Sequence, residues 1–265
     1  MKNTPLVPET CNLFIGENVT IQNNVTISNN CKSIKIGFGS FIGRDTYIDS
    51  ETLEIGEYTT IHHGSIIQGK KVVIGHNCWF GHYSMIDGTG GCFIGNNVGV
   101  GAHSQLWSHM KFGDVLEGCR FNSQNKLIIE DDVWFVGHSI VGPIKAEKKS
   151  LLMTGSLAVK DMKENKIYAG NPAKLMDTSE GQFILKTKSA KEKEFMSLVN
   201  SFNKTNKLKI EYKLVSFESF EKTLCLKGIS QFDVVNRLYM PTRETSEINF
   251  IKFMLYDKAK FIPRT

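Results

Sequence analysis

The sequence predicts a mainly β protein, a parallel β-helix of hexapeptide repeats followed by a small C-terminal α/β appendage. Large aliphatic or aromatic residues recur six positions apart in sets of three, and a mostly small residue follows each of them four positions later. Such a period is typical of architectures in which each repeat buries its neighbour. The sets are Ile15, Ile21, Ile27; Ile36, Ile42, Ile48; Ile55, Ile61, Ile67; Ile74, Phe80, Ile86; and Ile94, Val100, Leu106.

Each hexad is expected to supply one short strand and one corner of a triangular coil. Gly, Asn and Asp at the corners tolerate the backbone angles that tight turns require. Three hexads make one coil, and stacked coils hydrogen-bond as parallel strands at about 4.8 Å per layer. Between the sets the spacing lengthens, which places small insertions at one corner of the triangle.

One long insertion interrupts the repeat. The pattern stops after Leu106 and returns as Ile129, Phe135 and Val141, and a segment of that length in a compact repeat is usually functional or disordered. We therefore divide the chain into a β-helix domain at 1–176, with an inserted loop at 107–126, and an appendage at 177–265. In the appendage we expect a lysine-rich helix, a strand at 209–217 and a helix at 245–256.

Composition describes an ordinary soluble protein, with a net charge of +5, 41% hydrophobic and 22% charged residues. The lysines of 186–209 fit a solvated helix face and give no case for nucleic acid. Without an apolar run that could cross a bilayer, or a leader at Met1, we expect a cytoplasmic protein with no integral membrane segment. The six scattered cysteines, Cys225 among them, fit reduced thiols and form no zinc knuckle.

Histidines identify a candidate site, because all seven lie in the β-helix half. His109 opens the long insertion, and Asp87, one coil earlier on the same face, should lie below Trp107 and diagonal to His109. Imidazole takes up and returns protons near neutral pH, and a carboxylate can fix its tautomer. We expect His109 to be the catalytic base, with Asp87 orienting it. His62, His63 and His76 are interpreted as exposed corner residues, whereas His82, His103 and His138 either line a site or fill corners.

Several motifs together resemble a known family. They are Ser108-His109, the run Ile129 to Trp134, Thr154-Gly155-Ser156, Val159-Lys160-Asp161 and the tail Ala169-Gly170-Asn171-Pro172-Ala173-Lys174. Across about 15–175 the chain resembles the hexapeptide-repeat acetyltransferases, and it is most similar to galactoside and surface-polysaccharide O-acetyltransferases. The resemblance implies a left-handed β-helix, although parallel crossovers are normally right-handed. It also implies acetyl-CoA as donor, no metal, and a homotrimer with active sites between subunits.

The resemblance also assigns roles to individual residues. The pantetheine arm of acetyl-CoA would pass Gly137, Thr154 and Gly155, and the ammonium groups of Lys160 and Lys174 would approach its phosphates. Trp134 matches a tryptophan of the family pattern beside the acetyl site. From their places in the repeat we expect His82, Tyr83 and Trp107 to contact the substrate as well. Two features of the sequence depart from the family pattern. An asparagine that assists the acceptor in galactoside enzymes is absent from the stretch Gly81 to Tyr83, and late-hexad glycines are replaced at Val136 and Met153.

The implied reaction is direct acetyl transfer, in a ternary complex, to a sugar hydroxyl of a surface glycan or glycan precursor. One alternative is N-acetylation of a nucleotide-linked amino sugar. Others are a zinc carbonic anhydrase that uses His82, His103 and His109 across a subunit boundary, and a β-helix without catalysis. The sequence leaves open the acceptor, the role of the appendage, and whether loop 107–126 covers its own or a neighbouring site.

Overall fold

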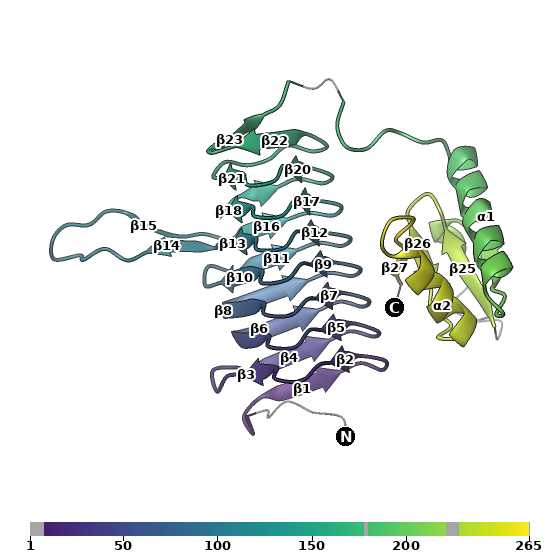
Figure 1. Ribbon diagram of the computed structural model, residues 1–265, viewed down its shortest axis with the longest axis horizontal. Coiled ribbons are helices and arrows are strands. Elements are labelled where there is room, and N and C mark those ends of the chain that lie inside the picture. Colours follow the sequence, from purple (N-terminus) through teal and green to yellow (C-terminus); the bar gives the residue numbers. More distant parts are fainter. Residues whose placement is uncertain (1–7, 178–179, 221–227, 265) are drawn as a thin grey trace. The chain divides into compact units, whose positions relative to one another are not determined.

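Parallel strands stack coil upon coil to form a triangular β-helix in the computed structural model, which describes residues 8–177, 180–220 and 228–264 (Figure 1). The first face contains β1 (Asn12–Ile15), β4 (Ser33–Ile36), β11 (Cys92–Ile94), β16 (Leu127–Ile129) and β19 (Lys145–Ala146). The second contains β2 (Thr20–Ile21), β5 (Phe41–Ile42), β7 (Thr60–Ile61), β9 (Trp79–Phe80), β12 (Gly99–Val100), β17 (Trp134–Phe135), β20 (Leu151–Leu152) and β22 (Ile167–Gly170). The third contains β3 (Thr26–Ile27), β10 (Met85–Gly88), β13 (Gln105–Leu106), β18 (Ile140–Val141) and β21 (Leu157–Ala158).

Two longer strands and a hairpin complete the stack. β6 (Tyr47–Ile55) and β8 (Ile66–Ile74) run from the third face into the first and pair with each other along both. At the C-terminal end β23 (Ala173–Leu175) folds back antiparallel on β22. The mainly β fold class, a parallel β-helix of six-residue repeats, is therefore confirmed.

Inward-pointing hexad residues form the core as vertical columns. On the second face Ile42, Ile61, Phe80, Val100 and Phe135 pair in register on successive coils, and each is fully buried. Burying apolar area in every layer is the main favourable contribution to folding, so each coil depends on its neighbours for stability. The six-residue period of the sequence is thus the period of the core.

The triangle has two regular corners and one irregular corner. We call the corner between the first and second faces the first corner, that between the second and third faces the second corner, and the remaining one the third corner. Every coil from β2 to β21 places a residue with positive φ at the second corner, and Asn, Asp or Gly, which tolerate this conformation, fill four of the seven positions. These residues are Asn24, Asp45, Gly64, Tyr83, His103, His138 and Gly155, with φ between 56° and 69°.

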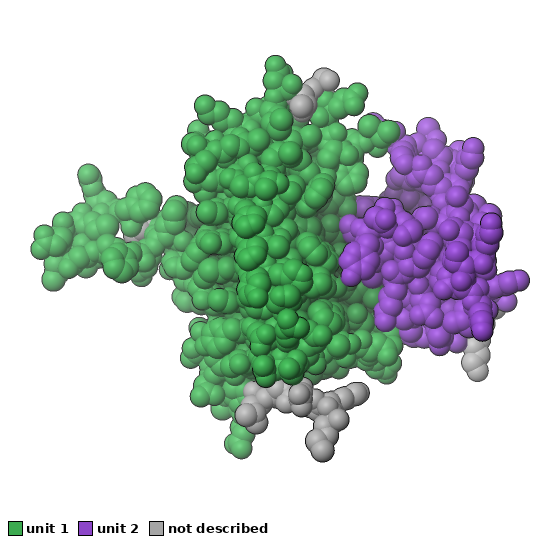
Figure 2. Space-filling model, in the orientation of Figure 1, with its two compact units in different colours: residues 1–184 green, residues 185–265 purple. Residues whose placement is uncertain are grey.

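The long insertion leaves the third corner as an antiparallel hairpin. Its strands, β14 (His109–Lys111) and β15 (Asn122–Gln124), extend away from the coils as an arm (Figure 1). The outer part of the arm exposes large apolar side chains among charged ones, with Phe112 102% and Leu116 92% exposed. Figure 2 shows this arm standing clear of the coils of its own unit.

The chain divides into two compact units, Met1–Ile184 and Leu185–Thr265 (Figure 2). The second unit contains α1 (Lys188–Thr205), α2 (Thr245–Met254), a 3-10 turn at Phe217–Ser219 and a sheet of β24 (Glu211–Leu214), β25 (Ile229–Asp233), β26 (Leu238–Met240) and β27 (Ile262–Pro263). Phe195 and Phe250 from the two helices contact Phe232 of β25, with ring centroids 5.0 and 6.0 Å away. The α/β appendage is confirmed, with a hairpin of β25 and β26 that the sequence did not predict.

Two further observations concern the whole chain. No helix in the described part is both long and apolar enough to span a bilayer. Cys11, Cys31, Cys78, Cys92 and Cys119 form no disulfide, and Cys225 lies outside the described residues.

Candidate active site

The third corner brings His109 and Asp87 together. Ile86 pairs with Leu106 in register, so Asp87 follows directly below Trp107. The Asp87 carboxylate is fully buried, and its Oδ1 lies 2.8 Å from His109 Nδ1. The His109 side chain stays 24% exposed at the base of the hairpin. The structure therefore places a partly open imidazole on a buried carboxylate.

Several donors fix the position of the Asp87 carboxylate. Oδ1 accepts hydrogen bonds from Ser108 Oγ at 2.8 Å and from the Thr89 backbone N–H at 3.2 Å. Oδ2 accepts from Thr89 Oγ1 at 2.9 Å and from Gln68 Nε2 at 3.2 Å. A buried carboxylate is costly unless it is paired and hydrogen-bonded, and this one has partners on both oxygens.

The same contacts determine the charge of Asp87. Burial acts to raise the pKa of the carboxyl, but the hydrogen bonds from His109, Ser108, Thr89 and Gln68 outweigh it and hold the pKa below its ordinary value. At neutral pH the carboxylate is therefore ionised and can only accept hydrogen bonds. The hydrogen bond to Asp87 must then be donated by Nδ1–H, and in the neutral form of the ring this makes Nε2 the acceptor. Among the described residues Nε2 has no hydrogen-bond partner.

Sequence reasoning identified the pair but missed its supporting residues. Gln68, Thr89 and Ser108 were not expected to contact Asp87. The contact of Gln68 could have been predicted from the repeat. Gln68 lies one coil before Asp87 at the same hexad position, and the two residues pair in register. Thr89 and Ser108 gave no such signal, since both lie at the irregular corner, where the repeat sets no register.

Trp107 completes this group of residues. Its ring centroid lies 5.9 Å from that of His109, nearly edge to face, and its Nε1–H donates to Gln105 Oε1 at 3.1 Å. The indole therefore forms one wall beside the imidazole. His109, Asp87 and Trp107 are the predicted site residues that the structure brings into contact at the third corner.

His82 and Tyr83 lie elsewhere, at the second corner. There the rings of Tyr83, His103 and His138 stack on successive coils with centroids 5.2 and 5.0 Å apart. His82 contacts His63, with centroids 4.0 Å apart. Burial first, and then the neighbouring His82, lowers the pKa of His62 below its ordinary value. The histidines at this corner thus form an aromatic column along the coils.

The residues predicted to bind the cofactor lie mainly above this column. Gly155 donates its backbone N–H to the Gly137 carbonyl at 3.2 Å, so both stand at the second corner with Thr154 beside them. An added Cβ at Gly155 would meet no atom within 4 Å, which leaves this part of the corner open. Trp134, 48% exposed, lies on β17 of the second face. Exposed Lys160 follows β21 at the third corner, and exposed Lys174 lies in β23.

Metal ligation finds no support in the described residues, which contain no group of three or more His, Cys, Asp or Glu side chains arranged to hold an ion. Within one chain His82 and His103 lie at the second corner, and His109 lies at the third.

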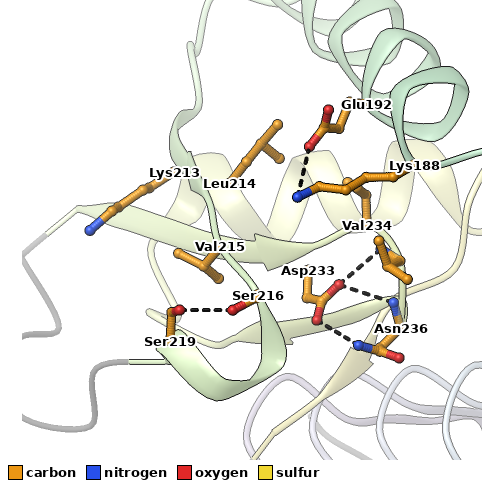
Figure 3. Close-up of a pocket in the computed structure, with 11 residues that line it drawn as sticks. Lys188, Glu192, Lys213, Leu214, Val215, Ser216, Ser219, Asp233, Val234 and Asn236 are labelled. Atoms are coloured by element: carbon orange, nitrogen blue, oxygen red, sulfur yellow. Dashed lines mark hydrogen bonds and ion pairs between the residues drawn. The ribbon is translucent and has the colours of Figure 1, made fainter.

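A separate cavity of about 610 Å³ lies in the second unit (Figure 3). Its buried carboxylate, Asp233, accepts hydrogen bonds from the backbone N–H groups of Val235 and Asn236 at 2.9 and 3.0 Å and from Asn236 Nδ2 at 2.8 Å. Lys188 pairs with Glu192 at 3.8 Å. Because the carboxylate stabilises its own turn, this cavity offers no reactive pair comparable to His109 and Asp87.

The fold and the site define a hexapeptide-repeat β-helix with an aspartate–histidine pair at the base of an inserted hairpin. No family model matches the sequence. Over 112 residues the chain is 30% identical to YJL218W of Saccharomyces cerevisiae, provisionally described as an acetyltransferase; the match covers 41% of this chain. The chain spans 56% of the length of that relative.

Solved structures give weaker likenesses. AntD, an N-acyltransferase from Bacillus cereus, is 16% identical with a TM-score of 0.45, over 74% of this chain and 92% of that one. The polysialic acid O-acetyltransferase OatWY is 16% identical with a TM-score of 0.41, over 67% and 94%. A hexapeptide-repeat acetyltransferase from Vibrio cholerae, VCA0836, is 15% identical with a TM-score of 0.35, over 54% and 69%. Likenesses this low give no information about activity.

Proposed function

We propose that this protein is an acetyltransferase that transfers the acetyl group of acetyl-CoA to a sugar hydroxyl of a glycan. The observation that carries the proposal is the 2.8 Å contact between buried Asp87 and partly open His109. When a carboxylate accepts the hydrogen bond from Nδ1–H, Nε2 of the neutral ring is ready to accept a proton. This is the arrangement that general-base catalysis needs. The activity described for the yeast relative supports the same reaction class.

In the proposed reaction both substrates are bound at once. His109 Nε2 takes the proton from the sugar hydroxyl while the hydroxyl oxygen attacks the thioester carbonyl. His109 then returns this proton to the departing thiolate, so the base is regenerated within one turnover. Asp87 keeps the imidazole in the required tautomer and stabilises its protonated form, because the carboxylate stays charged throughout.

The donor would lie along the upper coils. At the second corner, Gly137 and Gly155 present backbone without side chains, beside exposed Thr154, and a narrow flexible arm fits such a surface. Exposed Lys160 and Lys174 supply ammonium groups suited to phosphates. Trp134 offers an exposed ring on the adjoining face.

A homotrimer would assemble these parts into one site. Within one chain the candidate base lies at the third corner, whereas Gly137, Thr154 and Gly155 lie at the second. A neighbouring copy that places its second corner against the third corner of this chain would bring the two groups together. The exposed apolar hairpin supports such an arrangement, since large apolar surfaces usually mark interfaces.

Replacing the imidazole tests the proposal. His109→Ala is expected to lower kcat by about two to four orders of magnitude while acetyl-CoA binding persists, since only the acid-base group is lost. Free thiol release and mass spectrometry of the acetylated product measure the rate and the linkage. His76→Ala is the control, because that ring accepts from the Glu57 backbone N–H at another corner. Equal rates for His109→Ala and wild type would disprove the mechanism.

A further inference from the structure

A polar groove of about 760 Å³ runs along the third corner on the N-terminal side of His109. Its walls come from four successive coils, which contribute Asn30, Glu51, Lys70 and Thr89 in turn. At about 4.8 Å per layer, three steps between coils give the groove a length of about 14 Å. Its volume lies in the range of ligand sites, and its length exceeds that of a single sugar ring.

The groove ends at residues that hydrogen-bond to the carboxylate of the candidate catalytic pair. Two of the residues that line it, Gln68 and Thr89, donate hydrogen bonds to the Asp87 carboxylate, at 3.2 and 2.9 Å. Below them Asp49 pairs in register with Gln68, so Asp49, Gln68 and Asp87 stand in one column. A ligand that fills the groove would therefore end at Gln68 and Thr89, which contact Asp87 and, through it, His109.

The charges of the groove favour a neutral ligand. Its two lysines, Lys32 and Lys70, are balanced by two carboxylates, Asp49 and Glu51. Lys32 pairs with Glu51 at 2.6 Å, and Asp49 accepts a hydrogen bond from Asn30 Nδ2 at 2.9 Å. A pyrophosphate group would require uncompensated cations or a cluster of backbone donors. Alternating donors and acceptors instead suit the hydroxyl groups of a sugar chain.

We propose that this groove binds the acceptor as an extended, uncharged oligosaccharide chain, with the hydroxyl to be acetylated placed at His109. The assignment deepens the proposed function and rests on it for the chemistry, but binding in the groove can be measured without turnover. It selects a glycan chain over a nucleotide-linked monosaccharide, because the two lysines of the groove are balanced by two carboxylates and leave no net positive charge for a pyrophosphate.

The first experiment measures binding alone. Fluorescently labelled His109→Ala protein is applied to a printed array of neutral and acidic glycans and nucleotide-linked sugars. Neutral chains should be retained, and adding Lys70→Ala or Glu51→Gln should weaken their binding about three- to tenfold, as expected for the loss of one ordinary hydrogen bond. Lys71→Ala and Glu54→Gln are matched controls, since they alter neighbouring residues that do not line the groove.

The second experiment uses the retained glycan as an acceptor for wild-type protein, in a length series from the monosaccharide upward. kcat/KM should rise with chain length until the groove is filled, and Lys70→Ala should remove most of that gain. Retention of nucleotide-linked sugars alone, no retained glycan, or equal kcat/KM at every length would overturn the groove assignment. If glycans bind to the array-tested protein but the wild-type protein does not acetylate them, the proposed function would be disproved, whereas the assignment of the groove as a glycan-binding site would be supported.

Discussion

At the scale of single residues, the site depends on one carboxylate with an unusual set of partners. Asp87 is fully buried, yet donors from three different coils meet its two oxygens. The bonds from Gln68 and Ser108 join residues 19 and 21 positions apart on neighbouring coils, so the carboxylate stabilises the stacking of the coils as well as orienting His109. Its effect on stability should therefore be measurable separately from any activity.

Acid titration tests this stabilising role. The pKa of Asp87 in the folded protein lies below its ordinary value of 3.8. Its contribution to stability is thus fully present above that value and is lost as the pH falls through the folded-state pKa. Asp87→Asn should lower the melting temperature at neutral pH, because the amide cannot accept all the donors.

Thermal melts of both proteins across a pH series provide the measurement. The gap in melting temperature between wild type and Asp87→Asn should narrow once the pH drops below the ordinary aspartate value of 3.8. Asp45→Asn, at an exposed corner with 51% of the side chain accessible, should show little gap at any pH. If the difference in melting temperature between wild type and Asp87→Asn stayed constant across the pH series, the stabilising role of the ionised Asp87 carboxylate would be contradicted.

At the scale of elements, the base of the hairpin packs closely against the coil below it at Gly90. Gly90 donates its backbone N–H to Ser108 Oγ at 2.9 Å. A Cβ added at Gly90 would lie only 2.4 Å from the Ser108 carbonyl oxygen and 2.5 Å from that of Asn125. The absence of a side chain there thus lets both ends of the hairpin rest on the coil.

Gly90→Ala is expected to displace the hairpin base and, with it, His109. A shift of about 1 Å in a catalytic group can reduce turnover about a hundredfold, so kcat should fall strongly although no reacting group is changed. Gly142→Ala is the matched control, since its added Cβ would make an ordinary contact of 3.5 Å with the Ala158 carbonyl oxygen. Equal kcat for the two variants would show that the hairpin base does not position His109.

The sequence predicts elements well wherever the repeat continues. The hexad residues Ile42, Ile61 and Phe80 occupy the expected column, and the placement of Asp87 below Trp107 follows from the same register. The pairing of β14 with β15 was not predictable, because the hairpin has no six-residue period. The groove could not be predicted from the sequence either, since it forms from insertions at the irregular corner of four different coils.

At the scale of the whole molecule, the proposed site needs two copies of the chain. A mixture of His109→Ala with a second variant, Thr154→Trp, tests this requirement. Each variant alone should be nearly inactive, because one lacks the base and the other blocks the path of the donor. In a randomly mixed trimer, half of the chains carry an intact His109 and the other half an intact Thr154. A site that takes one residue from each of two chains is then intact in about a quarter of cases.

Denaturing and refolding the two variants together, then measuring thiol release, provides the test. Refolding each variant separately and mixing afterwards is the control, because preformed assemblies exchange chains less readily. No recovery after joint refolding would show that the base and the donor path belong to the same chain.

The coil length has a consequence for evolution. Gln68 and Asp87 are 19 residues apart, as are Lys32 and Glu51, so at these positions one layer along the groove corresponds to a module of 19 residues. Duplicating such a module between β6 and β8 would extend the groove by about 4.8 Å without changing the layer that holds Asp87 and His109. The number of layers beneath the reacting pair would then act as a molecular ruler, which selection could reset by adding or deleting whole repeats.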